Sequence, residues 1–376
     1  MDIKITKYGW GNVNSQTSRP RLDVWIARKQ MNKRNFDPNG VGVKGGGIFG
    51  LPFSPDEAQI VLIPAPWGVT VSYGGGTHNG PRAIYEASPQ IDYAHPSYGN
   101  ETWKVGVAML PLKEWEDVYD QGIGLRKKAE QHIASLSHGK SDAVPTEINV
   151  ECEAFNARIK KTALDLIAKS KLVGLVGGDH STPLGLMQAL AEKHEFGILQ
   201  IDAHNDLKDA YEGFTYSHAS IMWNALKIPQ VKKLVQVGIR DYSPGDVDSI
   251  EASGGRIQDF FDAEIKRQLY EGETWSKIVN KIVSTLPDKV YISFDIDGLD
   301  PSNCPHTGTP VPGGLQFQEA MHLIEAVARS GKKIIGFDLN EVSPSNDTEL
   351  NQSVGMRVLW NLAMWAAKSN QLKSLF

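Results

Sequence analysis

Short apolar segments alternate with helical segments through most of the chain, and this alternation limits the folds that it can adopt. Each apolar segment is too short for a helix and predicts a buried strand. The expected strands are 60–63, 105–109, 172–176, 196–201, 234–239, 290–294 and 333–337; the expected helices are one starting at 82, then 149–169, 182–193, 262–286 (interrupted), 317–329 and 353–368. Continuous apolar strands alternating with helices are typical of an α/β fold whose parallel sheet is covered on both faces.

The alternation also predicts the domain organisation. It begins near residue 59, and no linker interrupts it afterwards. Although a chain of 376 residues can form one or two domains, we predict a single main domain, residues 55–376, preceded by an N-terminal arm, residues 1–54. The arm is rich in Gly, Asn, Lys and Arg, and one short helix is expected around 24–26. We expect the arm to pack on the main domain or on a neighbouring subunit.

The charge and the cysteine content argue against several classes of protein. A net charge of -5 and a pI near 6.1 are atypical of proteins that bind nucleic acids or anionic membranes. Only Cys152 and Cys304 are present, which argues against a disulfide framework and predicts a reducing, cytoplasmic location. No run of about 18 apolar residues is found, so no membrane span is expected.

Acidic residues and histidines follow four of the expected strands, at the point where each strand ends. They are His180, then Asp202, His204 and Asp206, then Asp295 and Asp297, and finally Asp338 and Glu341. Residues two apart in an extended chain share a face. Because ligands of open parallel sheets bind at the carboxyl ends of the strands, we expect these side chains to meet at one edge.

The residue types at this edge predict a pair of metal ions. Six candidate ligands, two imidazoles and four carboxylates, are too many for one tetrahedral zinc ion and suit a two-metal site: His180, Asp202, His204, Asp206, Asp295 and Asp297. Ligation rich in oxygen favours Mn²⁺, while nickel or cobalt stays open. The alternatives are structural: His180 as a helix-entry residue, and Asp295 and Asp297 in a solvated loop.

Three segments resemble the signature segments of the ureohydrolase family of arginases and agmatinases. They read Gly-Gly-Asp-His-Ser at 177–181, Asp-Ala-His-Asn-Asp at 202–206 and Asp-Ile-Asp-Gly-Leu-Asp-Pro at 295–301. The resemblance runs from about residue 59 to 368. It implies a three-layer α/β/α fold around a mostly parallel, eight-stranded sheet, and a homo-oligomer, either a trimer or a hexamer. It further implies a dinuclear metal centre, holding Mn²⁺ or Ni²⁺, that hydrolyses a guanidino group to urea.

The same resemblance implies roles for individual residues. His180, Asp206 and Asp295 would belong to one metal and Asp202, His204 and Asp297 to the other, with Asp202 and Asp295 bridging. Asp206 would take the proton of the attacking hydroxide, and His218 would shuttle protons. Glu341 would receive the guanidinium as a charge-assisted pair. Read alone, His218 is equally a surface or core residue, and Glu341 a helix-entry acid.

The expected substrate is a small cationic guanidino compound. The loop 207–216 lacks the polar Asn and Ser side chains that arginases carry there, which argues against arginase activity. Segments 36–53 and 67–73 resemble a subgroup that includes nickel-dependent guanidine hydrolases, so free guanidine is predicted, with agmatinase or guanidinobutyrase activity as alternatives. Two other classes stay open: a zinc deacetylase of the same fold, which uses one metal, and a non-catalytic scaffold, which would be expected to lose His218 or Glu341.

Overall fold

Eight parallel strands form one sheet at the centre of the protein. The computed structural model describes residues 36–43, 45–139 and 146–376. The strands are β1 (Ile60–Ala65), β2 (Val107–Met109), β3 (Leu172–Gly177), β4 (Phe196–Ile201), β5 (Val231–Ile239), β6 (Ile257–Phe261), β7 (Lys289–Asp295) and β8 (Lys333–Asn340). Their order across the sheet is β2-β1-β3-β8-β7-β4-β5-β6, and every neighbouring pair is parallel.

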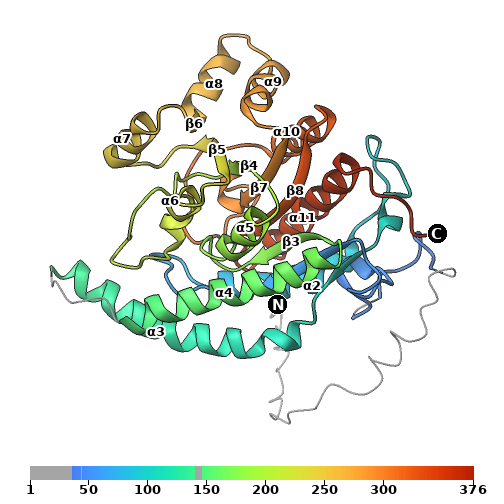
Figure 1. Cartoon of the computed structure of the whole chain (residues 1–376), viewed down its shortest axis with the longest axis horizontal. Helices are drawn as coiled ribbons and strands as arrows, with labels where there is room; N and C mark the ends of the chain where they lie inside the picture. The colour runs from blue at the N-terminus through green and yellow to red at the C-terminus, as the bar shows by residue number, and fades with distance from the viewer. Residues whose placement is uncertain (1–35, 44, 140–145) are drawn as a thin grey trace, which may run out of the picture.

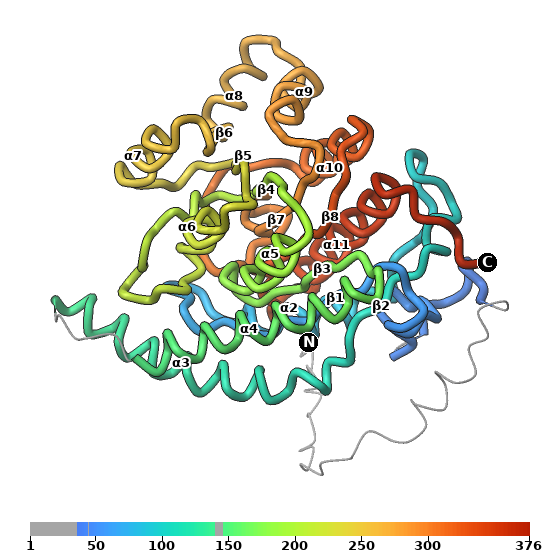
Figure 2. The backbone as a smooth tube through the Cα atoms, viewed as in Figure 1, coloured from blue at the N-terminus to red at the C-terminus, as the bar shows by residue number. Residues whose placement is uncertain are grey.

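Helices cover both faces of this sheet (Figure 1). They are α2 (Gly80–Ala87), α3 (Glu116–Ser137), α4 (Thr146–Ala168), α5 (Leu184–Ala191), α6 (Ile221–Leu226), α7 (Pro244–Ala252), α8 (Asp262–Tyr270), α9 (Trp275–Thr285), α10 (Phe317–Arg329) and α11 (Leu350–Ser369). Helix α4 packs on β1, β3 and α5, whereas α11 packs on β8, α2 and α10. The backbone trace shows α3 beside α4 along one side of the molecule (Figure 2). The predicted three-layer α/β/α fold is confirmed.

Most of the expected elements are present at their expected positions. Helix α10 has the predicted bounds, and the interruption expected within 262–286 separates α8 from α9. Four helices and strands were not predicted from the pattern: α3, α6, α7 and β6. Strand β6 pairs with β5 alone at the edge of the sheet, and only two of its five residues are buried. A strand so little buried lacks the continuous apolar run that marked the other strands.

The last part of the predicted arm packs on the main domain. Ile48, Phe49 and Leu51 are buried. The Phe49 ring meets Trp360 of α11 edge-on at 4.9 Å, and its carbonyl accepts a hydrogen bond from the Tyr93 hydroxyl. The short helix expected around 24–26 lies outside the described residues, and the boundary between residues 54 and 55 stays a prediction. Within the described ranges, no helix combines the length and apolar character needed to cross a membrane.

Candidate metal centre and active site

The predicted site residues converge because of the strand order. Strands β3, β8, β7 and β4 are consecutive in the middle of the sheet. His180 follows β3, Asp202 follows β4, Asp295 ends β7, and Glu341 follows β8. All of these strands run in the same direction, so their carboxyl ends form one continuous rim, and the structure brings all six predicted ligands together there.

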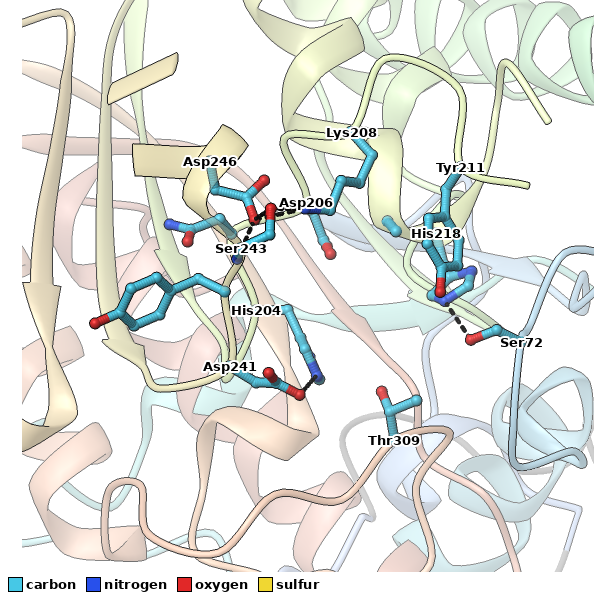
Figure 3. A pocket seen from close by; sticks show the side chains of 13 residues that line it. Ser72, His204, Asp206, Lys208, Tyr211, His218, Asp241, Ser243, Asp246 and Thr309 are labelled. Atoms are coloured by element: carbon cyan, nitrogen blue, oxygen red, sulfur yellow. Dashed lines mark hydrogen bonds and ion pairs between the residues drawn. The ribbon is translucent and has the colours of Figure 1, made fainter. Parts of the chain in front are cut away.

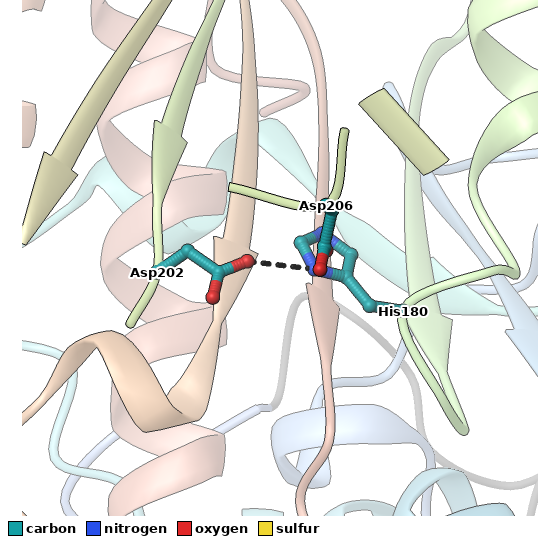
Figure 4. A group of neighbouring side chains, drawn as sticks. All are labelled: His180, Asp202 and Asp206. Carbon is teal, nitrogen blue, oxygen red and sulfur yellow. Dashed lines mark ion pairs between the residues drawn. The ribbon is translucent and has the colours of Figure 1, made fainter. Parts of the chain in front are cut away.

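Three carboxylates surround one nitrogen of His180. Its Nδ1 lies 2.9 Å from Asp202 Oδ2, 3.1 Å from Asp206 Oδ2 and 3.2 Å from Asp295 Oδ2. Figure 4 shows the carboxylates of Asp202 and Asp206, both from the segment that follows β4, beside the ring of His180. All four residues are buried. His180, Asp202 and Asp206 offer ligand atoms close enough together to share one ion.

A second group of candidate ligands lies beside the first and shares Asp202 with it. Asp202 Oδ1 lies 3.5 Å from His204 Nδ1, and His204 Nδ1 lies 3.1 Å from Asp297 Oδ2. These three residues also offer atoms close enough to hold one ion. The two oxygens of Asp202 therefore face different histidines, one in each group. This is the arrangement that a carboxylate needs to bridge two cations.

Hydrogen bonds on the far side of the His180 ring fix its proton. Ser293 Oγ donates to Asp338 Oδ1 at 3.0 Å and therefore accepts from His180 Nε2 at 2.9 Å. With the proton of the neutral ring on Nε2, the Nδ1 lone pair points at three carboxylates. Within the described parts of the chain Nδ1 has no hydrogen-bond partner, since its short contacts lack hydrogen-bond geometry. Because the lone pair of His180 Nδ1 faces those of three carboxylates, a positive charge between them would stabilise the site. One imidazole nitrogen and three carboxylate oxygens are a donor set that fits a divalent cation.

The pKa values of the same residues show the cost of leaving these charges uncompensated. Burial and repulsion from Asp202 raise the pKa of Asp206 to about 7. Burial, Asp297 and Asp202 raise the pKa of Asp295 well above its usual value. Burial opposes the charging of His180, but the close contacts of its Nδ1 with Asp202 and two further carboxylates raise its pKa well above the usual range. Without metal the site therefore holds protons, which a divalent cation would displace.

Backbone geometry aims the carboxylates and the histidine. Asp206 and Glu341 have φ of 56° and 63°, in the left-handed region that side chains other than glycine rarely adopt. Such strain costs on the order of 1–3 kcal/mol and occurs mainly at functional sites. The Gly-Gly turn before His180 has a steric reason, because a Cβ on Gly178 would lie 1.9 Å from the carbonyl oxygen of Trp67.

Glu341 presents one unpaired oxygen next to the first group of ligands. Its Oε1 accepts a hydrogen bond from the His180 backbone N–H at 2.9 Å, which fixes the carboxylate. Its Oε2 is buried and has no hydrogen-bond partner among the residues that the structure describes. Burial and repulsion from Asp179 raise the pKa of Glu341 well above its usual value. A cationic group of a ligand would pair with the free Oε2 and would also stabilise the ionised form of Glu341.

A cavity of about 440 Å³ opens over the second group. Figure 3 shows His204 and Asp206 on its wall together with His218. His218 Nε2 lies 3.4 Å from Ser72 Oγ, and its Nδ1 lies 3.2 Å from Ser217 Oγ. Burial lowers the pKa of His218 to about 3, helped by the nearby His204 and His180, so the ring is neutral at pH 7.

Sequence reasoning missed the residues that follow β5. Asp241, Tyr242, Ser243 and Asp246 line the cavity, and the Asp241 side chain is 66% exposed. On the same wall, Lys208 donates to Asp246 Oδ2 at 2.7 Å and to Ser243 Oγ. The strand-end rule that found the other residues also applies to β5, the next strand in the sheet, and would have found these.

Comparison with known proteins agrees with this geometry. The model of the arginase family matches residues 58–365. The chain is 34% identical over 327 residues to guanidinobutyrase from Pseudomonas aeruginosa, covering 83% of this chain and 87% of that protein. It is 32% identical over 300 residues to N(1)-aminopropylagmatine ureohydrolase from Thermus thermophilus, covering 79% and 87%.

Comparison with solved structures agrees with this fold. The structure of proclavaminate amidino hydrolase from Streptomyces clavuligerus superimposes with a TM-score of 0.67 at 23% identity, covering 89% of this chain and 100% of that one. At this identity the likeness concerns the fold. The family match, which spans most of the chain, and the two curated relatives carry the assignment. The protein belongs to the arginase family.

Proposed function

We propose that this protein is a ureohydrolase with two metal ions, which hydrolyses a C–N bond of a guanidino compound to release urea. One observation carries the proposal: the two oxygens of Asp202 face two histidine-containing groups, 2.9 Å from His180 and 3.5 Å from His204. The unpaired oxygen of Glu341 lies buried beside them. A bridged metal pair next to a lone carboxylate suits a cationic, planar guanidinium.

Six residues would hold the two ions. We assign His180, Asp206 and Asp295 to one ion and Asp202, His204 and Asp297 to the other, with Asp202 and Asp295 shared. Mn²⁺ and Ni²⁺ are the candidate metals. When bound, the pair lowers the pKa of water towards neutrality and so supplies hydroxide at physiological pH.

The remaining chemistry belongs to three side chains. Glu341 Oε2 receives the guanidinium and orients its carbon towards the ligand groups. Asp206, which lines the cavity as well as the first group, takes up a proton and passes it to the leaving amine. His218, neutral at pH 7, carries protons between this point and solvent through Ser72.

We further propose that the substrate carries a tail, with agmatine as the first candidate. The cavity extends beyond the ligand groups to Asp241, whose exposed carboxylate suits a terminal ammonium group. Both relatives are named for guanidino compounds with tails, which supports the alternative substrates more than the free guanidine expected from residues 36–53 and 67–73. Guanidinobutyrate is the second candidate, because the cation of Lys208 stands on the same cavity wall.

A urea-release assay tests both parts of this proposal. Protein loaded with Mn²⁺ or Ni²⁺ is given agmatine, guanidinobutyrate, guanidine and arginine side by side. We expect the highest kcat/KM with agmatine and none with Asp202→Ala, which removes the shared ligand. A preference for guanidine would restore the substrate predicted from the sequence. Inactivity on all four would support a scaffold, and one metal per chain would support a deacetylase.

We also propose that the protein forms a homo-oligomer, a trimer or a hexamer, as the family resemblance implies. Light scattering on the eluting peak of a sizing column measures the mass of the assembly directly. A monomeric mass near 41.4 kDa would contradict this proposal without affecting the assignment of the metal ligands.

A further inference from the structure

A row of buried amides crosses three strands behind the shared ligand Asp202. Gln200 of β4 pairs in register with Gln236 of β5, and Gln236 pairs in register with Asp259 of β6. Asn205 joins the row from the loop after β4. Gln200, Gln236 and Asn205 are all buried, and none of them belongs to the six candidate ligands.

The row starts at the metal groups with Gln200. Its Nε2 donates to Asp202 Oδ2 at 2.7 Å and to the His204 carbonyl oxygen at 3.2 Å. Its Oε1 accepts a hydrogen bond from Gln236 Nε2. Gln200 therefore holds the same Asp202 oxygen that faces His180, while the other oxygen accepts from the His204 backbone N–H at 2.7 Å.

The row continues away from the metal groups and ends at a second carboxylate. Gln236 Nε2 also donates to the Asn205 carbonyl oxygen at 2.8 Å. Asn205 Nδ2 donates to Gln236 Oε1 and to Asp259 Oδ2, both at 3.0 Å. Each of the three amide nitrogens thus makes two hydrogen bonds, which uses every N–H that they carry.

Carboxylates at both ends give this row a single direction. Ionised Asp202 and Asp259 accept only, so the amide nitrogens of Gln200 and Asn205 must point at them. Gln200 can then offer only its side-chain oxygen to Gln236, so the side-chain nitrogen of Gln236 must donate to it. Reversing one amide would place two acceptors against each other in a buried site, a cost of about 1–3 kcal/mol per unpaired group. The amides therefore hold one another in orientation, and through Gln200 they hold Asp202.

We propose that Gln200, Gln236 and Asn205 are positioning residues that keep Asp202 turned so that each of its oxygens serves a different metal ion. The inference rests on the proposed two-metal function. Partners behind a ligand typically change metal affinity about 10–100-fold when removed, because they set the direction and basicity of the ligand. Gln200 and Gln236 act on the metal pair through Asp202 and do not line the cavity, whereas Asn205 forms part of its wall.

Two variants test this proposal at different distances from Asp202. Gln200→Met keeps the length of the side chain and removes the direct donor. Gln236→Glu is remote from the metal groups, but it presents acceptors to Gln200 Oε1 and to the Asn205 carbonyl and so turns Gln200 away from its bond to Asp202. Mn²⁺ binding is measured by titration calorimetry on the full chain, and the exchange coupling of the bound pair by electron paramagnetic resonance.

We expect both variants to bind the second Mn²⁺ about 10–100-fold more weakly and to lose the coupled spectrum at two equivalents of metal. For Gln236→Glu, the direction of the change in Mn²⁺ affinity is informative. The added negative charge alone would strengthen cation binding, whereas loss of the Gln200 contact should weaken it. Gln258→Glu is the matched control, since it makes the same change on the neighbouring β6 position, beside Lys233 Nζ, and should leave both readouts unchanged. If Gln236→Glu does not fold, Gln236→Met tests the same contact without a charge.

Wild-type affinity and coupling in Gln200→Met and in the folded Gln236 variant would overturn the positioning role. Failure of the wild-type chain to bind two coupled Mn²⁺ ions would instead count against the proposed function, so the two failures are distinguishable.

Discussion

At the scale of single residues, the two oxygens of Glu341 have different surroundings. One accepts the His180 backbone N–H and fixes the side chain, while the other is buried and unpaired within the described structure. His218 is half-buried, and its two ring nitrogens contact the hydroxyl groups of Ser72 and Ser217. The first residue is therefore suited to binding a cation, and the second to moving protons.

Glu341→Gln should weaken substrate binding without loss of metal. The amide keeps an acceptor for the His180 N–H but removes the charge, and a hydrogen bond to a charged group contributes about 1.5–3 kcal/mol. We expect KM for agmatine to rise roughly 10–100-fold, with two metal ions per chain retained in elemental analysis. Glu349→Gln, on the exposed start of α11, is the control. An unchanged KM would remove Glu341 from the binding site.

His218→Ala should reduce the rate more than the affinity. A positioned acid or base contributes about 10²–10⁴-fold to a reaction, so kcat should fall by that order while the metal content stays at two ions. The exposed His138→Ala is the matched control. Steady-state kinetics over a range of agmatine concentrations separate the two parameters, and an unchanged kcat would exclude His218 from proton transfer.

At the scale of elements, tertiary contacts explain two of the elements that were not predicted, α3 and β6. Helix α3 contains Gly122 and Gly124, which lower helix propensity and hide the helix in the sequence. Gly122 is needed where α3 passes Trp67, because a Cβ there would lie 3.3 Å from the indole ring. Strand β6 is an edge strand with polar residues at inward positions, including Asp259. Both elements are stabilised by tertiary contacts, and these contacts cannot be predicted from the local pattern of apolar residues.

Strand β6 gives a prediction about pH. Burial raises the pKa of Asp259 to about 6, above the value of about 3.9 in an unfolded chain. The folded state therefore binds the proton more tightly, and stability falls as pH rises from about 4 to 6. Asp259→Asn removes this penalty while keeping an acceptor for Asn205. It should stabilise the metal-free protein by on the order of 1–3 kcal/mol at pH 8 and by nothing measurable at pH 4.

Urea unfolding of the metal-free protein at the two pH values measures this difference. Asp248→Asn, at an exposed position of α7, should change neither value. Equal stabilisation by Asp259→Asn at both pH values would show that ionisation of this carboxyl group is not the cause.

At the scale of the whole molecule, the strand order determines how far the sequence could predict the site. The chain elements that carry His180, Asp202, Asp295 and Glu341 are distant in sequence, yet their strands are four neighbours in the sheet. Strand-end residues can be read from the sequence once a parallel sheet is expected, so the six ligand candidates were found. The same rule, applied to the predicted strand 234–239, would also have found the segment after β5. The order of the strands cannot be read from the sequence, so the amide row from β4 to β6 was missed.

Metal removal should lower the stability of the entire fold, because the ligands come from several strands. A ligand that binds only the folded state adds about 2.7 kcal/mol when its free concentration is 100 times its Kd. We expect chelation of Mn²⁺ to lower Tm by several degrees, roughly 1–2 °C for each kcal/mol in a domain of more than 300 residues. Calorimetry with and without chelator measures the shift. Asp202→Ala should show little or none of it, and an equal shift in that variant would contradict the shared ligand.

The candidate metal ligands and part of the cavity wall come from different segments of the chain, so substrate preference could be redesigned separately from the metal site. The segments that follow β3, β8, β7 and β4 supply the candidate ligands, whereas part of the cavity wall farther out comes from the segment that follows β5, with Asp241 and Ser243. Exchanging residues 241–246 for those of a relative should therefore redirect substrate preference while the chemistry at the centre persists. Evolution can diversify such an enzyme at one turn of chain, leaving its reactive core untouched.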